Sequence, residues 1–112
     1  MAGRVGYLGE FEQVVLLAVV RLGDDAYGTN IRREIEARTA RRVTIGAIYV
    51  TLDRLTEKGY VRAREGAPSA ERSGRARRFF NLTPAGAAAL EAVRELQARM
   101  WAGIRLKGAR KA

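Results

Sequence analysis

Four arginines lie within seven residues of one another in the stretch RSGRARRFF (residues 72–80), which ends in two aromatic residues. A guanidinium group is permanently charged, and its planar fork of N–H donors fits a phosphate group or the edge of a guanine. Phe79 and Phe80 favour the opposite environment, a buried one. The stretch therefore predicts a basic segment that binds an anion and is held at its base by apolar side chains. The arginines are Arg72, Arg75, Arg77 and Arg78.

Two absences limit the other chemistry of this 112-residue chain, which has no cysteine and no histidine. Without cysteine there is no disulfide or thiolate metal site, and a reducing, cytoplasmic setting is expected. The commonest general base, nucleophile pair and zinc ligands are also missing. We therefore expect no enzyme, no cofactor and no metal. A hydrolase is the remaining catalytic alternative, built on carboxylates that occupy positions typical of helix starts and turns, namely Glu10, Glu12, Asp24 and Asp25.

The net charge of +9 is gathered in patches. Residues 28–42 carry +3 and residues 60–80 carry +4, whereas residues 43–59 are neutral. Such patches indicate an anionic partner, and they favour nucleic acid over a membrane surface. The longest apolar run, residues 14–20, is far shorter than the roughly 20 residues that cross a bilayer. We expect a cytoplasmic protein that binds double-stranded DNA and no membrane.

Three helices are predicted in the first half of the chain, after a loose tail at residues 1–7. The first, over residues 8–22, is apolar on nearly all sides and ends at the turn Gly23-Asp24-Asp25. A domain this small covers such a helix on one side only, so a second copy of the chain is implied. The second is a surface helix with Ile31 and Ile35 on one face.

The third predicted helix begins at Thr44, a good N-cap, and ends at Lys58-Gly59. One stripe, expected to be buried, consists of Ile45, Ile48, Leu52 and Leu55. The opposite stripe is small and nearly uncharged, which fits a DNA major groove, where apolar groups meet thymine methyls. The alternative is that another part of the protein covers this face. Its residues are Gly46, Ala47, Val50, Thr51 and Arg54.

A switch to a period of two predicts a hairpin, with strands at residues 60–64 and 77–82 and a basic loop between them. Thr83 and Pro84 then start a last helix, which is expected to reach about Ile104. Its apolar stripe is close to coiled-coil spacing, and the distal half has nothing to meet in its own chain. We therefore expect a homodimer interface formed by Leu16, Val20, Leu90, Val93, Leu96, Met100, Trp101 and Ile104.

This order of elements predicts a mainly α fold with a small β-hairpin: a winged helix-turn-helix plus a long C-terminal dimerisation helix. The expected division is a flexible tail at residues 1–7, a DNA-binding domain at 8–82, a dimerisation helix at 83–105 and a basic tail at 106–112. A basic RNA-binding or assembly protein is the main alternative, but the chain lacks the aromatic platform of single-strand readers.

The expected DNA contacts fall into three groups. Thr44, Gly46, Ala47, Val50 and Arg54 would read bases from the third helix. Tyr49 would turn its hydroxyl to a phosphate or pack in the core, and the sequence does not decide between them. Contacts with the DNA backbone would come from the wing, through Arg72, Arg75 and Arg77. They would also come from Arg41 and Arg42 in the loop before the third helix, and the alternative for these two is that they are ordinary loop charges.

These segments resemble the PadR family of bacterial transcriptional regulators from Leu8 to about Gly86. The resemblance is carried by the pair Tyr27-Gly28, by the spacing IYxxLxxL (residues 48–55) and by the closing LTPAG (residues 82–86). It implies a homodimeric repressor that binds an inverted repeat and is often released by a small molecule.

The single last helix and short tail are similar to the short subfamily of these regulators. In its drug-binding members, an interfacial tryptophan stacks on planar ligands. Trp101 is the candidate for this role, and an ordinary dimer anchor is the alternative.

Overall fold

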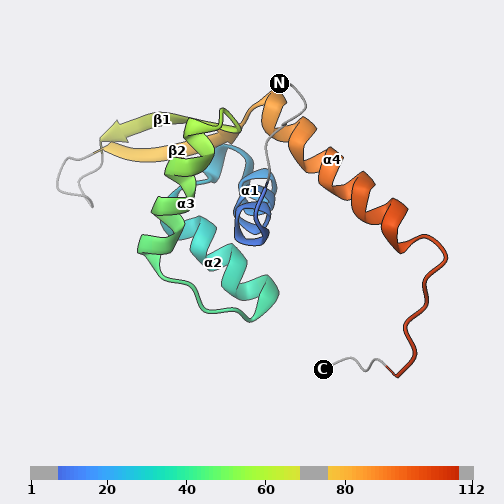
Figure 1. Ribbon diagram of the computed structural model, residues 1–112. Helices are drawn as coiled ribbons and strands as arrows, with labels where there is room; N and C mark the ends of the chain where they lie inside the picture. The colour runs from blue at the N-terminus through green and yellow to red at the C-terminus, as the bar shows by residue number, and fades with distance from the viewer. Residues whose placement is uncertain (1–7, 69–75, 109–112) are drawn as a thin grey trace.

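The computed structural model describes residues 8–68 and 76–108 of the chain (Figure 1). Three helices form a small bundle, a two-stranded hairpin lies beside the third helix, and the last helix projects away on the other side. The expected mainly helical fold with one hairpin is confirmed. In the described ranges, no helix is long and apolar enough to span a membrane. The elements are α1 (Glu10–Leu22), α2 (Gly28–Thr39), α3 (Ile45–Glu57), β1 (Val61–Pro68), β2 (Ala76–Leu82) and α4 (Pro84–Trp101).

Several expectations concern residues outside the described ranges. They are the tail at residues 1–7, the last residues of the basic tail, and Arg72 and Arg75 of the wing.

Helix α1 lies at the centre of the bundle and packs against all the other helices and β2. Leu16 is fully buried in this core. The expectation that Leu16 belongs to a dimer interface is therefore wrong, because its own chain already covers it. Leu17 and Val20, by contrast, are 50% and 48% exposed and form an apolar face that the chain leaves open.

The core is continuous through the three helices and the base of the hairpin. Phe80 of β2 is the largest of its fully buried side chains, so the aromatic end of the arginine-rich stretch does reach the interior. Its backbone N–H also donates to the carbonyl of Ala26, at 2.8 Å, which ties β2 to the turn after α1. The other fully buried large side chains are Leu16, Ile31, Ile48, Leu52, Leu55, Val15 and Val19.

Helix α3 begins as the sequence predicts, because the Thr44 hydroxyl accepts a hydrogen bond from the Ala47 N–H at 3.1 Å. Its rotation about its own axis differs from the prediction. Thr51, placed on the open stripe, is buried, and Ile45, placed on the buried stripe, is exposed. The buried face is therefore centred on Ile48, Leu52 and Leu55, with Thr51 at its edge.

The hairpin is antiparallel, and Val61 pairs with Leu82, Ala63 with Phe80 and Arg64 with Phe79. Pairing continues through Glu65 opposite Arg78, so β1 runs further than the predicted strand, into residues expected to be loop. Because side chains alternate along a strand, the two faces differ. The face with Phe80 turns to the core, and the other carries Arg62, Arg64, Phe79 and Asn81.

Helix α4 is shorter than predicted. It ends at Trp101, and the chain then turns, with Gly103 at a φ of 80° and the Ile104 N–H donating to the Trp101 carbonyl at 2.8 Å. Ile104 therefore lies beyond the helix, although it is exposed as expected. At the start of α4, a Cβ atom on Gly86 would overlap the carbonyl oxygen of Tyr60, so only glycine allows this close approach to the chain before β1.

A mostly buried ion pair joins the start of α1 to the end of α3. Both carboxylate oxygens of Glu12 lie 2.9 Å from Lys58 Nζ, and the Gly9 N–H donates to Oε1 at 2.8 Å. Burial raises the pKa of Glu12, but the hydrogen bonds from Lys58 and Gly9 and the charges of Lys58 and Arg54 together hold it below its ordinary value. The carboxylate is thus more stable in the folded chain than in the unfolded one.

Replacing Glu12 with glutamine is expected to lower the free energy of unfolding at neutral pH by about 1 to 2 kcal/mol. Because the pKa of Glu12 is lower in the folded chain than in the unfolded chain, its carboxylate stabilises the fold at pH values above the unfolded-state pKa. This stabilisation is lost as the pH falls through the folded-state pKa. The difference from the wild type should therefore shrink in acid, as urea unfolding from pH 7 to pH 3 would show. Glu10→Gln is the control, since Glu10 is an exposed residue of the same helix. An equal loss in both variants would contradict the prediction.

Candidate nucleic-acid interface

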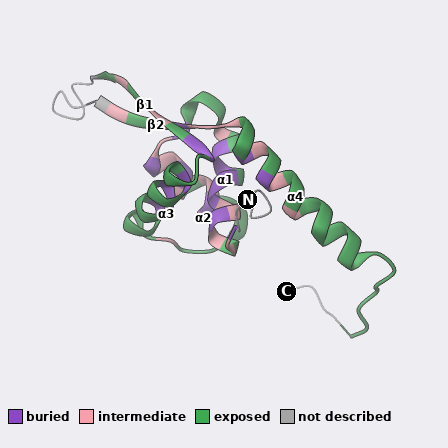
Figure 2. Ribbon diagram, turned by 45° about the horizontal axis from the view of Figure 1, so that its top comes forward, coloured by how far each residue is buried: buried purple, intermediate pink, exposed green. Residues whose placement is uncertain are grey.

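The open face of α3 brings together most of the residues predicted to read bases. Gly46, Ala47, Val50 and Arg54 are all exposed, and Val50 is 54% exposed although it is apolar. A Cβ atom on Gly46 would meet nothing within 4 Å, so a ligand can approach the backbone there. This face is seen in Figure 2 as the exposed outer side of α3. It is shaped for close contact with a flat or grooved partner.

The structure adds Asp53 and Glu57 to this face, and sequence analysis missed both. They follow Gly46 by seven and eleven residues, so both lie on its line along the helix. Their spacing from Gly46 predicts this position, but the predicted open stripe was centred on the side of Thr51, which left both residues out.

The loop before α3 places its two arginines differently. Arg41 donates to both carboxylate oxygens of Glu10, at 2.9 and 3.1 Å, and lies over the ring of Phe11. The hydrogen bond and the charge of Glu10 raise the pKa of Arg41. Arg41 is thus turned toward α1, which differs from the free phosphate-binding charge that was expected. Arg42 is exposed and makes no ion pair within the described residues.

Tyr49 packs against the first turn of α2. A Cβ atom on Gly28 would overlap the Tyr49 hydroxyl and lie 2.5 Å from its Cζ, so glycine at this position makes room for the ring. The arrangement accounts for the sequence pair Tyr27-Gly28, whose glycine is needed where α2 meets α3. Tyr49 therefore packs on α2 at the surface and not in the core, since its side chain is 37% exposed, and its contact with a phosphate stays a prediction.

Two aromatic rings with an arginine at each end lie along the outward face of the hairpin. The Arg77 guanidinium lies 4.0 Å from the centre of the Tyr27 ring, Tyr27 meets Phe79 edge to face at 5.5 Å, and Arg64 lies 4.7 Å over Phe79. Arg64 also donates to Asn81 at 3.0 Å and to the Asp24 carbonyl at 2.9 Å. The hairpin is thereby fixed to the turn between α1 and α2.

Arg77, expected to contact the DNA backbone from the wing, is the second residue of β2, and its guanidinium lies on the ring of Tyr27. Its charged end is held in place on one side by the ring, and no hydrogen bond or ion pair engages it within the described residues. Three further arginines on the strands were not predicted as site residues. Arg62 and Arg64 project from the outward face, at alternate positions of β1, whereas Arg78 lies on the face that carries Phe80.

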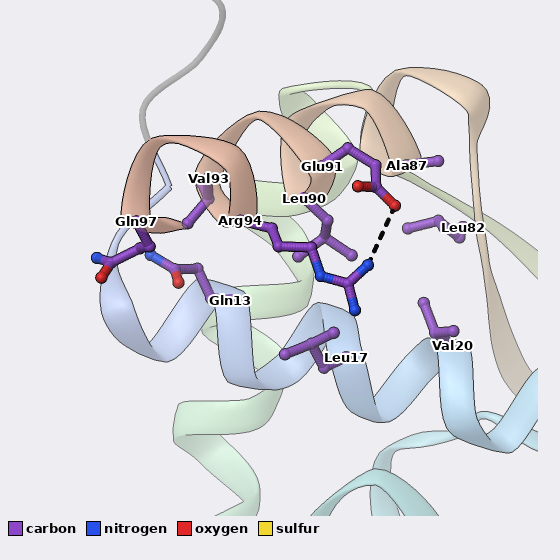
Figure 3. Close-up of a pocket in the computed structure, with 10 residues that line it drawn as sticks. All are labelled: Gln13, Leu17, Val20, Leu82, Ala87, Leu90, Glu91, Val93, Arg94 and Gln97. Carbon is purple, nitrogen blue, oxygen red and sulfur yellow. Dashed lines mark ion pairs between the residues drawn. The ribbon is translucent and has the colours of Figure 1, made fainter. Parts of the chain in front are cut away.

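A separate apolar groove lies between α1 and α4, and Leu82 at the end of β2 also lines it (Figure 3). It has a volume of about 520 Å³, and Leu17 and Val20 of α1 face Leu90 and Val93 of α4 across it. Arg94 reaches from α4 over Leu17 and pairs with Glu91 at 3.6 Å. Leu90 and Val93 are partly buried here by their own chain, rather than fully available to a partner.

Trp101 is not part of this groove. It lies at the far end of α4 with Met100, Ile104 and Leu106, around a smaller apolar hollow of about 200 Å³. Its indole N–H donates to the Gln97 side chain at 3.2 Å. Trp101 and the α1–α4 groove are therefore two distinct apolar surfaces.

A three-helix bundle with an exposed third helix beside an arginine-lined hairpin defines the winged-helix class of DNA-binding proteins. The sequence profile of the transcriptional regulator PadR-like family matches residues 16–92. The chain therefore belongs to the PadR-like family of transcriptional regulators, whose members bind DNA and are not enzymes. Among curated protein sequences, none matches this chain significantly.

Solved structures agree with this fold. A winged-helix DNA-binding protein from STIV is 20% identical to this chain, with a TM-score of 0.68. The match covers 89% of this chain and 100% of that protein. A PadR-like transcriptional regulator from Bacillus cereus is 20% identical with a TM-score of 0.66, covering 82% of this chain and 84% of its own. A PadR family regulator from Clostridium difficile is 22% identical to this chain, with a TM-score of 0.62. The match covers 80% of this chain and 88% of that regulator.

Proposed function

We propose that the chain is a homodimeric transcriptional repressor that binds an inverted-repeat operator. The observation that carries this proposal is the small, open face of α3 beside the arginines of the hairpin. In this proposal α3 enters the major groove, where Gly46, Ala47 and Val50 approach base edges, and Arg54 reaches a base or a phosphate. Repression follows when a bound dimer covers a promoter. Residues 8–82 would form the DNA-binding unit and residues 83–105 the dimerisation helix.

The proposed dimer rests on apolar surface that one chain leaves open. Leu96, Met100 and Trp101 are exposed along the distal half of α4, and Leu17 and Val20 are exposed on α1. Figure 2 shows that the distal half of α4 is exposed all round. A second copy that packs its α4 against these faces would remove both from water and would place two α3 helices on one face of DNA.

A planar or aromatic small molecule is proposed to release the DNA. The α1–α4 groove has the size of a small-molecule site, and its apolar walls include a few polar groups from Gln13, Arg94 and Gln97. A ligand there would contact both the bundle that carries α3 and the helix that carries the dimer interface. Trp101 is the alternative residue for contacting the ligand. If it does not bind ligand, its role is that of an ordinary anchor in the dimer interface.

The proposed function is tested by titrating the protein into a labelled duplex from upstream of its own gene, beside a scrambled duplex of the same composition, at several salt concentrations. A specific reader is expected to prefer its site by a factor on the order of a thousand or more. If the first duplex shows no preference, selection from random duplexes replaces it. A preference for structured RNA at matched salt would favour the RNA-binding alternative instead.

Replacing Arg77 with alanine is expected to weaken binding to the operator and to the scrambled duplex by a similar factor. The slope of log affinity against log salt should fall by about one unit for each phosphate group that the variant no longer neutralises. Arg105→Ala is the control, because it removes the same charge beyond the end of α4, on the other side of the fold from the hairpin. An Arg77→Ala slope equal to that of the control would remove Arg77 from the interface.

A further inference from the structure

A carboxylate stands at the centre of the open face of α3. Asp53 follows Val50 by three residues and Gly46 by seven, so the three lie along one line of the helix. Asp53 is exposed, and within the described part of the chain no hydrogen bond or ion pair engages its carboxylate. The residue is thus presented to whatever partner covers this face.

An unpaired carboxylate is unfavourable beside DNA, which carries one negative charge for about every 1.7 Å of its axis. The base edges in the major groove differ in what they offer such a group. Cytosine presents a donor, its N4 amino group, whereas guanine presents two acceptors and thymine an acceptor and a methyl group. Adenine combines a donor with an acceptor. Because an ionised carboxylate only accepts hydrogen bonds, cytosine is the base that it matches without repulsion.

We propose that Asp53 is a specificity-determining residue, which accepts a hydrogen bond from the N4 amino group of a cytosine in each half-site. The proposal rests on the function proposed above, with α3 in the major groove. The neighbours of Asp53 support it, since Gly46 permits close approach of the backbone and Val50 adds an apolar contact on the same line. The carboxylate of Asp53 then lowers the affinity for DNA with any base other than cytosine at this position, and so it favours one sequence.

The test is selection from random duplexes with the wild type, Asp53→Asn and Asp53→Ala. The wild type should enrich an inverted repeat with a cytosine at one position of each half-site. Asn is expected to shift that position to adenine, which it contacts bidentately, and Ala should leave it degenerate, with all other positions unchanged. Affinity of the Ala variant for the wild-type operator should fall roughly tenfold or more for each half-site.

Glu95→Gln is the control, because Glu95 is an exposed carboxylate on α4, outside the open face of α3. This variant should select the wild-type sequence. If Asp53→Ala also selects the wild-type sequence and binds operator and scrambled duplex more tightly by one common factor, Asp53 only repels phosphates, and the inference is wrong while the repressor function stands. If the wild type enriches no sequence, the proposed function fails first, and the inference fails with it.

Discussion

Replacing Phe80 with alanine is expected to lower the free energy of unfolding by about 3 to 5 kcal/mol, the usual cost of removing a fully buried phenylalanine. Domains of this size are stable by about 5 to 15 kcal/mol in total, so the variant would lose a large part of its stability. The loss is large because Phe80 is fully buried, so alanine leaves a cavity in the core. Urea unfolding followed by circular dichroism measures it, at one protein concentration for all variants.

Phe79→Ala is the matched control, since it removes the same side chain from the next position of β2. Phe79 is only partly buried and stacks with Tyr27 and Arg64 on the outward face of the hairpin. Its removal should cost clearly less stability. Equal losses for the two variants would contradict the prediction that burial makes Phe80 the stronger anchor of the hairpin.

The Phe80 prediction also concerns DNA binding, because the hairpin carries its arginines at a fixed distance from α3. The Arg77 guanidinium lies on a ring that belongs to the turn before α2, and Phe80 holds the same strand from its other face. Under conditions in which Phe80→Ala stays folded, a loosened hairpin should weaken binding to all sequences. The base preferences set by α3 should persist.

The fold was predictable from the sequence where the signals are local. The caps at Thr44 and Thr83 are confirmed by hydrogen bonds from Ala47 and Gly86 within each helix's first turn. Hydrophobic periodicity identified the buried line of α3 because spacing along one helix decides it. The buried end of the arginine-rich stretch followed from alternation along a strand.

The parts of the site that were not predictable depend on partners distant in sequence. Arg41 is held by Glu10, and Arg77 is held by Tyr27, and neither pairing is encoded in a local pattern. The rotation of α3 is likewise set by packing against α1, α2 and β1 at once, which turned Thr51 inward and Ile45 outward. This rotation places Asp53 on the open face, so the residue proposed to contact cytosine is among those that the sequence pattern did not predict.

Replacing Leu96 with glutamate is expected to convert the proposed dimer into a monomer and to lower operator affinity by about a hundredfold or more. Leu96 is half exposed in the distal part of α4, where the chain offers it no cover. A charge there would have to be buried unpaired in the dimer, which is strongly unfavourable. A monomer reaches one half-site at a time, and the gain from linking two binding events, typically a factor of 10² to 10⁴, is absent.

Ala98→Glu is the matched control, since it adds the same charge to the same helix at an exposed position two residues on, which does not share a face with Leu96. Light scattering at micromolar concentration gives the mass of each variant, and the operator titration gives its affinity. The control should stay dimeric and bind as the wild type does. A wild-type chain that scatters as a monomer, or a monomeric Leu96→Glu that binds the operator with undiminished affinity, would overturn the dimeric mechanism. Two half-sites about one helical turn apart require two α3 helices, and one chain supplies only one.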